Sequence, residues 1–289
     1  MHSILRRRRS VENHLKLNSS IIECSMSVFF RRTSRPQVVG MIHVAALPGA
    51  PGYRSDFEAV MASAIADAIS LENGGADAVM VENFFDTPFP SGDSAAVTIS
   101  HLTAIAIAVS REIKIPMGIN LLRNDAIGAL AVAQASAAQF IRVNVLAGTR
   151  VTDQGLINGD AYRVMRERSR CGAHHIGIAA DVDVKHSAPL TKRPIEEEAT
   201  ELAGRGGADA IIVSGSATGK STSHQDLRQV RNACPDSFLM VGSGVDVQNA
   251  SQLAEHCDAM IVGSSLKTEG QITAPVDVER VRRLMNCLV

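Results

Sequence analysis

The chain has 289 residues, of which 45% are apolar and 20% are charged, and its net charge at neutral pH is −1. This composition is ordinary for a soluble globular protein, and the chain has no run of about 18 apolar residues that could span a membrane. With no Trp, only two Tyr and a mildly acidic body, it lacks the basic face and aromatic platforms that nucleic-acid binding favours.

The first 36 residues differ in composition from the rest. Seven Arg and one Lys against two Glu give this segment a net charge of +6, and no apolar stretch of the secretory type follows the Arg run. The composition resembles a mitochondrial transit peptide, although Glu12 and Glu23 are unusual in one. The alternatives are a disordered basic tail or a chain that starts at Met26. We predict a targeting extension over 1–36, one folded domain over 37–289, and a mitochondrial location, or otherwise a cytoplasmic one.

The five cysteines are scattered along the chain and form no C-x-x-C pair; they are Cys24, Cys171, Cys234, Cys257 and Cys287. An odd count without metal-binding spacing indicates reduced thiols in an intracellular compartment. Free cysteines are usually buried and fill space as small apolar side chains do. We therefore expect no disulfide framework.

Two segments of the sequence repeat each other. GGADAVMVEN at 74–83 recurs as GGADAIIVSG at 206–215, which starts 132 residues later, and weaker copies lie at 137–146 and 256–265. Each copy holds a short apolar run, as expected for a strand covered on both faces. A barrel of about 250 residues gives about 32 residues to each strand–helix unit. The strong copies are therefore strands two and six of eight, and the weak copies are strands four and eight.

Further apolar runs supply the odd strands, at 38–43, 115–120, 175–185 and 238–244. Helical segments lie between the strands, near 56–73, 98–112, 125–137, 160–171, 195–205, 224–233, 247–255 and 276–287. Asp56 and Thr98 are candidate N-caps for two of these helices. Strict alternation implies parallel strands with right-handed crossovers. Because eight units are evenly spaced and no G-x-G-x-x-G follows strand one, we predict a closed (β/α)₈ TIM barrel rather than an open doubly wound sheet.

Polar residues follow the apolar run of nearly every predicted strand. In a TIM barrel these positions surround one mouth, where several strands contribute to a single active site. The candidates for catalysis are His43, Glu82, Asp181, Asp183 and Lys185. The candidates for binding substrate or phosphate are Asn120, Arg123, Asn124, Arg142, Asn144, Ser214, Gly215, Gly219, Gly242, Ser243, Gly244, Gly263 and Ser264.

Strand five carries the clearest pattern of charges. Asp181, Asp183 and Lys185 alternate with valines, and a period of two places them on one face of a strand. Because unpaired charges are costly to bury in the helix layer, we expect all three at the mouth. There the two carboxylates would repel each other and raise at least one pKa, against the effect of Lys185.

This group has three interpretations. The side chains could transfer protons. Glu82, Asp181 and Asp183, together with His43, could instead bind Mg²⁺ or a similar divalent cation. The third interpretation is a structural salt-bridge cluster that closes the top of the barrel, since ion-pair networks also perturb pKa values.

Glycines gather after strands six, seven and eight, in SGSATGKST (214–222), VGSGVD (241–246) and IVGSSLK (261–267). Glycines let backbone N–H groups approach an anion, and the helix after GSGVD would present its positive N-terminus. Barrels often hold phosphate at the loops after strands seven and eight, so we predict a phosphate site there, with plain turn chemistry as the alternative. GSATGKS lacks one residue of the Walker spacing, which argues against an NTPase loop.

Taken together, the strand-end motifs resemble the BtpA/SgcQ family of predicted TIM-barrel proteins. The matching stretches are GMIHVAALPGAP (40–51), GGADAVMVENFFDTPF (74–89), GINLLRNDA (118–126), FIRVNVLAGTRVTDQGLING (140–159), ADVDVKHSAPL (180–190), ADAIIVSGSATG (208–219), VGSGV (241–245) and DAMIVGSSLKTEG (258–270). The resemblance covers about residues 38–285. It implies a barrel with a site at its mouth but no particular reaction, and the family is named partly for a role in photosystem I biogenesis.

These observations favour an enzyme that acts on a small phosphorylated metabolite, such as a sugar phosphate or a nucleotide-like compound. Arg123 and Arg142 would bind further ligand oxygens. Isomerase, epimerase, lyase and glycosidic-cleavage reactions all suit acid and base groups at strand ends, and Lys185 could form a Schiff base if its pKa is depressed. The alternatives are a non-catalytic organellar assembly factor or a metabolite sensor that uses the barrel as a scaffold. We expect no nucleic-acid partner and no membrane span, and the chain could form a homo-oligomer.

Overall fold

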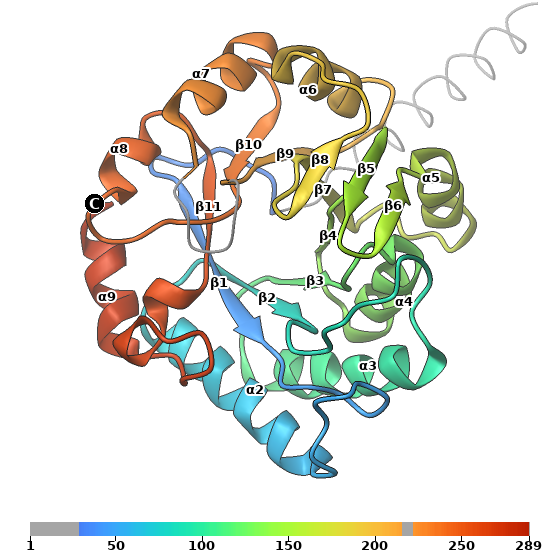
Figure 1. The fold of residues 1–289 in the computed structure, drawn as a ribbon. Coiled ribbons are helices and arrows are strands. Elements are labelled where there is room, and N and C mark those ends of the chain that lie inside the picture. The colour runs from blue at the N-terminus through green and yellow to red at the C-terminus, as the bar shows by residue number, and fades with distance from the viewer. Residues whose placement is uncertain (1–28, 216–221, 289) are drawn as a thin grey trace, which may run out of the picture.

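The computed structural model describes residues 29–215 and 222–288. Within these residues, eight parallel strands close into a barrel in the order β1, β11, β10, β9, β7, β4, β3, β2, surrounded by helices (Figure 1). The strands are β1 (Gln37–His43), β2 (Ala78–Glu82), β3 (Met117–Asn120), β4 (Phe140–Val143), β7 (Gly177–Asp183), β9 (Ala210–Val213), β10 (Phe238–Val241) and β11 (Ala259–Val262). The predicted (β/α)₈ barrel is confirmed. The repeated segments form β2 and β9, four strands apart around the ring.

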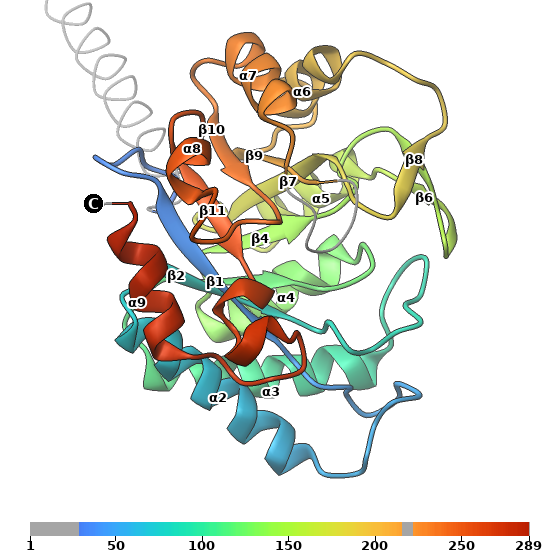
Figure 2. The same ribbon diagram turned by 60° about the vertical axis from the view of Figure 1, so that its left-hand side comes forward.

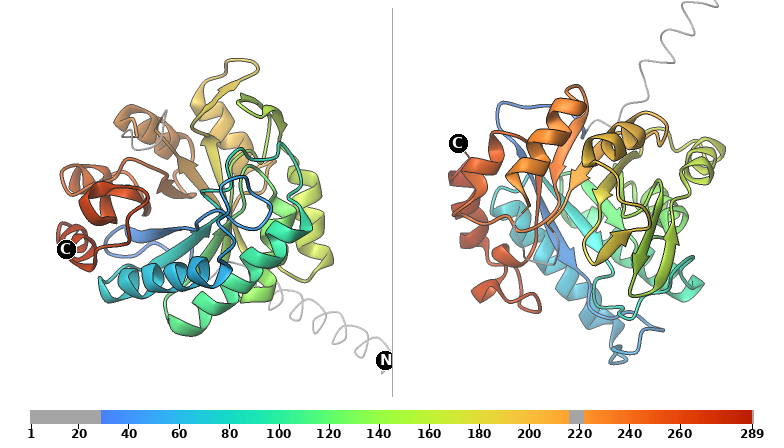
Figure 3. Two further views of the ribbon diagram at one scale, coloured as in Figure 1. Left: turned by 60° about the horizontal axis from the view of Figure 1, so that its bottom comes forward. Right: turned by 45° about the horizontal axis from the view of Figure 1, so that its top comes forward.

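The helices form the outer layer of the barrel, as the two views in Figure 3 show. They are α2 (Phe57–Asn73), α3 (Ala96–Glu112), α4 (Ala126–Ser136), α5 (Ala161–Arg170), α6 (Ile195–Ala203), α7 (His224–Ala233), α8 (Ala250–Ala254) and α9 (Val278–Asn286). Asp56 caps α2 by accepting a hydrogen bond from the amide of Ala59 (3.0 Å), as predicted. The prediction for Thr98 is wrong, because α3 begins two residues earlier, after Ala95. In the described residues, none of these helices has the length and apolar character that crossing a membrane requires.

Side chains alternate between the two faces of each strand, so the barrel has an outer and an inner apolar layer. Val38 and Ile42 of β1 face outward and join the cluster that the helices cover. Val39 and Met41 of the same strand face the lumen. They pack there with side chains from the other strands, among them Met80, Phe140, Ile212, Phe238, Met240 and Ile261.

The chain before β1 closes the N-terminal end of the lumen. Phe29 and Phe30 are each only 4% exposed. The Phe29 ring stacks on Phe140 with 4.6 Å between centroids, and the Phe30 ring lies 5.4 Å from that of Phe238. Residues 29–36, which the sequence assigned to the extension, therefore belong to the folded domain, because their aromatic side chains fill the end of the barrel. The rest of the predicted extension lies outside the described residues.

A small antiparallel sheet stands beside the other end of the barrel. It comprises β5 (Thr149–Thr152), β6 (Gly155–Asn158) and β8 (Ser187–Pro189) in the order β6-β5-β8. Figure 2 shows it at the carboxyl ends of the barrel strands, away from the segment that precedes β1. The sequence analysis did not predict this sheet. Its strands come from the loops after β4 and β7, so it adds a wall next to the mouth.

Candidate active site at the barrel mouth

The lumen side chains change from apolar to polar at the carboxyl ends of the strands. Two residues beyond the last lumen-facing residue of each strand, toward its carboxyl end, lies one residue that contributes to a ring of eight. The members are His43, Glu82, Asn120, Arg142, Asp181, Ser214, Gly242 and Gly263. All eight were predicted as site residues, and together they form the floor of the mouth.

Arg142 and Asp181 occupy the centre of a hydrogen-bonded network in this floor. The Arg142 guanidinium donates from Nε and Nη2 to the two Asp181 oxygens, at 2.9 and 2.8 Å. The same carboxylate accepts from Asn144 Nδ2 (3.1 Å) and Ser214 Oγ (2.7 Å). Both charged side chains are almost fully buried, at 3% and 0% exposure. Arg142 thus forms a bidentate ion pair with Asp181, and the two charges neutralise each other. Each oxygen of the Asp181 carboxylate already accepts two hydrogen bonds.

Asp183 departs from the predicted arrangement. Strand β7 has a β-bulge after Asp181, since Asp181 pairs with Ile212 while Asp183 pairs with the next residue of β9, Val213. The bulge turns Asp183 away from the floor, where it accepts a hydrogen bond from Arg150 of the small sheet (2.9 Å). The expectation that the two aspartates and Lys185 share one face is therefore wrong for Asp183. Partial burial is the main cause that raises the pKa of Asp183, and repulsion from Asp181 makes a smaller contribution in the same direction. The positive charge of Arg150 lowers this pKa in part.

The proposed divalent-cation site fits this geometry poorly. Glu82, Asp181 and Asp183 form no shared ligand set, because the oxygens of Asp181 are saturated by donors and Asp183 faces the small sheet. The positive charges of Arg142 and Lys185 act on Glu82 and would repel a cation. Across residues 29–215 and 222–288, no three His, Cys, Asp or Glu side chains gather as metal ligands would. We therefore derive no chemistry through a metal ion.

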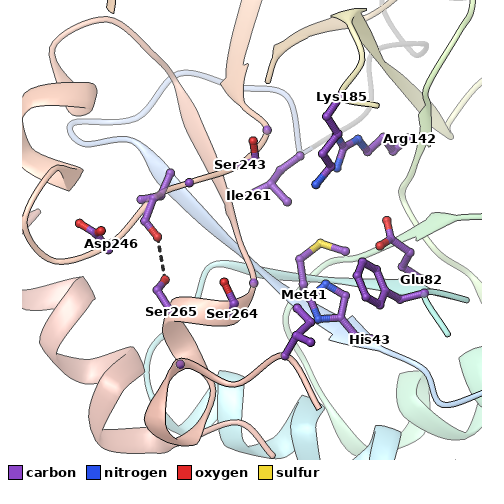
Figure 4. Close-up of a pocket in the computed structure, with 17 residues that line it drawn as sticks. Met41, His43, Glu82, Arg142, Lys185, Ser243, Asp246, Ile261, Ser264 and Ser265 are labelled. Carbon is purple, nitrogen blue, oxygen red and sulfur yellow. Dashed lines mark hydrogen bonds between the residues drawn. The ribbon is translucent and has the colours of Figure 1, made fainter. Parts of the chain in front are cut away.

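A cavity opens above one side of the floor, between β1, β2 and the loops after β10 and β11. Its lining includes Met41, His43, Glu82, Phe84, Arg142, Lys185, Ser243, Gly244, Asp246, Ile261, Gly263 and Ser264. Figure 4 shows Lys185, Arg142 and Glu82 on one wall and Ser243, Asp246, Ser264 and Ser265 on the other. The cavity therefore joins the predicted catalytic groups to the predicted phosphate loops.

Three titratable side chains of this cavity have shifted pKa values. Burial raises the pKa of Glu82, although Arg142 and Lys185 act in the opposite direction. Burial lowers the pKa of Lys185, and the Arg142 charge adds to this effect. Burial, with the charges of Lys267 and Lys185, lowers the pKa of His43 to about 3, so this imidazole is neutral at physiological pH.

Several buried polar atoms of the floor have no hydrogen-bond partner within the described residues. Asn120 donates from Nδ2 to Glu82, and Asn144 donates to Asp181, which fixes the orientation of both amides. Their Oδ1 atoms, and Nδ1 of His43, remain unpaired. Buried polar atoms in proteins are nearly always paired, so these three atoms are exceptions, and of the three residues only His43 lines the cavity.

The glycines of the floor have a packing role that the sequence did not indicate. A Cβ on Gly242 would lie 2.2 Å from Ser214 Oγ, and one on Gly263 would lie 2.8 Å from His43 Cε1. Both positions therefore need glycine to leave room for their neighbours. Gly244 differs, since its φ of +71° is a backbone conformation that favours glycine.

The loops after β10 and β11 leave some amides without partners. Within the described residues, the amides of Gly244, Val245, Ser264 and Ser265 donate no hydrogen bond. The helix after GSGVD is shorter than predicted: α8 has five residues. The carboxylate of Asp246 already accepts from the amides of Gln248 and Asn249, at 2.9 and 3.0 Å, just ahead of it. Any anion binding here would therefore rest on the loop amides and not on the helix N-terminus.

The other predicted residues of these loops lie nearby. Ser243 Oγ accepts from the amide of Gly215 (3.0 Å), which links the loops after β9 and β10. Gly219 lies outside the described residues.

Arg123 and Asn124 form hydrogen bonds to the backbone of loops at the mouth. Arg123 Nη2 donates to the backbone carbonyl of Lys185 (2.6 Å). Asn124 bonds the amide and the carbonyl of Val145 at 2.8 and 2.9 Å, so its amide group joins the loops after β3 and β4. Neither residue lines the cavity. Their positions suit holding the backbone of the mouth better than contacting a ligand.

Sequence reasoning missed three residues at or beside the site. Phe84 packs its ring 4.5 Å from that of His43, and the VENFF motif directly after strand two could have indicated it. Asp246 lines the cavity and lies in the GSGVD motif that drew attention only for its glycines. Arg150 is buried between Asp183 and Glu198 of α6. Nothing local marks Arg150, because its partners come from distant segments.

Comparison with known proteins places this barrel in a family. The sequence pattern of the BtpA family matches residues 34–289. An uncharacterised protein of Thermococcus kodakarensis is 40% identical over 251 residues, a match that covers 87% of this chain and 94% of that protein. The chain belongs to the BtpA family. This confirms the resemblance drawn from the strand-end motifs.

Other BtpA-family relatives come from distant organisms. Photosystem I biogenesis protein BtpA of Synechocystis sp. is 39% identical over 263 residues, covering 91% of each chain. An uncharacterised Caenorhabditis elegans protein whose name includes the word mitochondrial is 33% identical, and the match covers 88% of this chain and 93% of that protein. The BtpA-family barrel is thus present in a cyanobacterium, an archaeon and an animal.

Solved structures share the fold of this BtpA-family chain. N-(5'-phosphoribosyl)anthranilate isomerase from Pyrococcus furiosus matches with a TM-score of 0.53 and 12% identity, covering 87% of this chain and 98% of that one. A tryptophan synthase structure from M. tuberculosis matches with a TM-score of 0.57 and 15% identity, covering 88% and 92%. At such identities the likeness shows the barrel fold alone.

Proposed function

We propose that this protein is an enzyme that transfers protons on a small phosphorylated metabolite at the mouth of the barrel. The observation that carries the proposal is the convergence of His43 of β1, Glu82 of β2 and Lys185 of the loop after β7 on one cavity beside the loops after β10 and β11. Isomerisation, epimerisation, carbon–carbon cleavage and glycosidic cleavage all require an acid and a base placed in this way.

The shifted acidities support proton transfer at this site. A Glu82 carboxyl with a raised pKa keeps its proton at a higher pH than an ordinary glutamate, and so can act as an acid. A Lys185 amine with a lowered pKa is free of its proton at a lower pH than an ordinary lysine, and so can act as a base or a nucleophile. The neutral imidazole of His43 can accept or relay a proton between them and the ligand.

The phosphate part of the proposal rests on the loops after β10 and β11. These are strands seven and eight of the barrel, where TIM barrels often hold phosphate. Unpaired amides of Gly244, Val245, Ser264 and Ser265 can donate to phosphate oxygens, and the Ser264 side chain lines the cavity (Figure 4). The ligand would then lie with its phosphate on this wall and its reacting carbon near Glu82 and Lys185.

A thermal-shift screen of phosphorylated metabolites, with and without Mg²⁺, tests the proposal. A ligand at about 100 times its Kd should add about 2.7 kcal/mol of stability. Ser264→Asp should abolish the shift by placing a negative charge on the phosphate wall, whereas Ser169→Asp, on the exposed surface of α5, should leave it intact. Absence of a shift with every phosphorylated compound would contradict the phosphate site.

The name of the Synechocystis relative favours a second candidate, a non-catalytic assembly factor. The two candidates differ in what they need from the mouth. Glu82→Gln and Lys185→Met should abolish the cellular function of an enzyme and spare that of a scaffold. Complementation of a deletion strain with these two variants separates the candidates.

We also propose a mitochondrial location. The basic, Arg-rich composition of residues 1–36 supports it, as does the name of the C. elegans relative. Fusing these residues to a fluorescent protein should direct it to mitochondria, and a cytoplasmic signal would contradict the proposal.

A further inference from the structure

Lys185 is the one amine that lines the cavity among the described residues. Its side chain makes no salt bridge and no hydrogen bond in the part of the chain that the structure describes. Lys267 differs: it is fully buried, and its Nζ bonds Asp67 at 2.6 Å. Lys185 is half-buried and has no carboxylate partner, so it is poorly suited to stabilising the fold and well suited to chemistry, because partial desolvation favours the free amine.

The surroundings of Lys185 keep its amine available. The nearby carboxylate of Asp181 is saturated by Arg142, Asn144 and Ser214, so it does not pair with Lys185. Arg123 holds the backbone carbonyl of Lys185 at 2.6 Å and fixes where the side chain starts. Figure 4 shows the amine projecting into the cavity, toward the space that Glu82 also faces.

We propose that Lys185 forms a covalent imine with its ligand, and that the ligand is therefore an aldehyde or ketone. This inference rests on the proposed function and narrows it, because it adds a carbonyl group to the phosphorylated metabolite. A carbonyl carbon placed between Lys185 and Glu82 would have a nucleophile on one side and a proton donor on the other, which are the two groups that imine formation requires.

The step balances with the groups of this cavity alone. The Lys185 nitrogen attacks the carbonyl carbon, the C–N bond forms as the C=O π bond breaks, and a proton passes from nitrogen to oxygen to give a carbinolamine. The protonated carboxyl of Glu82 then donates its proton to that hydroxyl. The C–O bond breaks, water leaves, and the nitrogen lone pair completes the C=N bond. The products are an iminium cation and the Glu82 carboxylate, with no oxidant or reductant consumed.

Asn120 acts as a positioning residue for this step. Its amide donates to one oxygen of Glu82, which leaves the other oxygen to carry the proton toward the ligand. The Glu82 carboxylate formed in the step would then lie close to the iminium charge. Withdrawal of electrons by this iminium would assist loss of a proton from the adjacent carbon, for which the neutral imidazole of His43 is available.

Reductive trapping tests the imine directly. The wild-type protein is incubated near neutral pH with glyceraldehyde 3-phosphate, or with glycolaldehyde, in the presence of cyanoborohydride, and adducts are located by peptide mass spectrometry. Lys185 should react faster than the exposed Lys192, because burial lowers the pKa of Lys185 and so leaves more of its amine free of the proton. The paired Lys267 should react more slowly than either.

Variants separate the roles of the two groups. Lys185→Met should remove the fast adduct and leave labelling of Lys192 unchanged. Glu82→Gln should slow the Lys185 adduct by about a hundredfold, the low end of general acid catalysis. Where Glu82 is ionised, its charge favours the protonated Lys185 amine, so Glu82→Gln would by itself free more of that amine, and where Glu82 is protonated the substitution changes no charge. A slower reaction therefore reports loss of the acid. Equal rates at Lys185 and Lys192 would overturn the proposal.

Glycerol 3-phosphate has a phosphate but no carbonyl group, so it tests the phosphate site separately from the imine. If it raises the melting temperature but neither aldehyde labels Lys185, the imine is wrong and the phosphate site stands. If glycolaldehyde labels Lys185 but no phosphate compound shifts the melting temperature, the imine stands and the phosphate site is wrong. If neither effect is seen, both fail.

Discussion

The two ends of the barrel lumen are built from opposite kinds of side chain. At the amino end of the strands, Phe29 and Phe30 pack on Phe140 and Phe238 within a cluster of apolar side chains. At the carboxyl end, the side chains of the floor are polar or charged, and those of Arg142 and Asp181 are almost fully buried. One lumen thus passes from an apolar plug to a polar floor over the length of a strand.

The contrast shows how one fold separates stability from chemistry. The apolar end contributes by burial, which needs no geometric precision beyond close packing. The polar end costs desolvation and is tolerated because each charge of the Arg142–Asp181 pair satisfies the other. Glu82, Lys185 and His43 are the groups that the proposed reaction would use, and the paired network lies beside them in the floor.

Breaking the central pair of the polar end should have the largest effect. Asp181→Asn leaves the Arg142 charge buried without a counter-charge and should destabilise the protein by about 3–5 kcal/mol. Asp183→Asn, two residues along the same strand, is the matched control. Its carboxylate is 56% exposed, so its loss should cost about 1 kcal/mol or less. Urea denaturation measures both, and equal losses would show that the two aspartates do not differ as described.

Removing an aromatic ring from the apolar end should lower the free energy of unfolding by slightly less than breaking the Arg142–Asp181 pair. Phe29→Ala deletes a buried ring that stacks on Phe140 and should destabilise by about 3 kcal/mol. Tyr162→Ala, on the outer face of α5 and 67% exposed, should change stability by no more than about 0.5 kcal/mol. If Phe29→Ala behaves like Tyr162→Ala in the same denaturation assay, residues 29–36 do not belong to the folded unit.

Lowering the pH should decrease the stability of the folded protein, because His43 at the polar end stays neutral in the folded state. The unfolded chain takes up a proton at this histidine below about pH 6.5, whereas the folded protein holds it neutral until about pH 3. Between these values the unfolded state binds more protons, so stability falls as pH falls, by at most about 1.4 kcal/mol per pH unit from this group. His43→Gln should flatten the dependence in this window. The exposed His174, changed to Gln, should leave it as it is.

The smallest effect should come from the loop after β10. Gly244→Ala must adopt a φ of +71°, which costs an L-residue about 1–2 kcal/mol. Gly92→Ala has no atom within 4 Å of the new methyl group and no positive φ, so it should be neutral. Thermal unfolding compares the two. A neutral Gly244→Ala would mean that this wall of the cavity can relax.

The sequence was sufficient for the barrel and for most of its floor. The GGADA repeat assigned β2 and β9 to opposite sides of the ring, and reading the polar residues at the end of each apolar run then located His43, Glu82 and Arg142 at the mouth. These predictions succeeded because strand spacing and alternation are local properties of the chain. The eight-membered floor follows from them by counting two residues onward from each lumen side chain.

The features that could not be predicted from the sequence depend on contacts between distant segments. Asp183 follows the same alternation as Asp181, and only pairing with β9 introduces the bulge that turns it toward Arg150. The small sheet joins residues from two separate loops, and neither loop alone resembles a strand of the barrel. Phe29 lies next to an Arg-rich segment, whose composition concealed its place in the core.

The aromatic plug also constrains the order in which the molecule can be assembled. Phe29 and Phe30 leave the ribosome well before their partners Phe140 and Phe238. Contacts between residues so far apart in sequence form slowly, since a long loop must close before they contribute stability. During synthesis the two rings are therefore exposed to any chaperone that binds aromatic residues, until β10 arrives. Closure of the barrel and burial of its first aromatic residues would then be a single late event in folding.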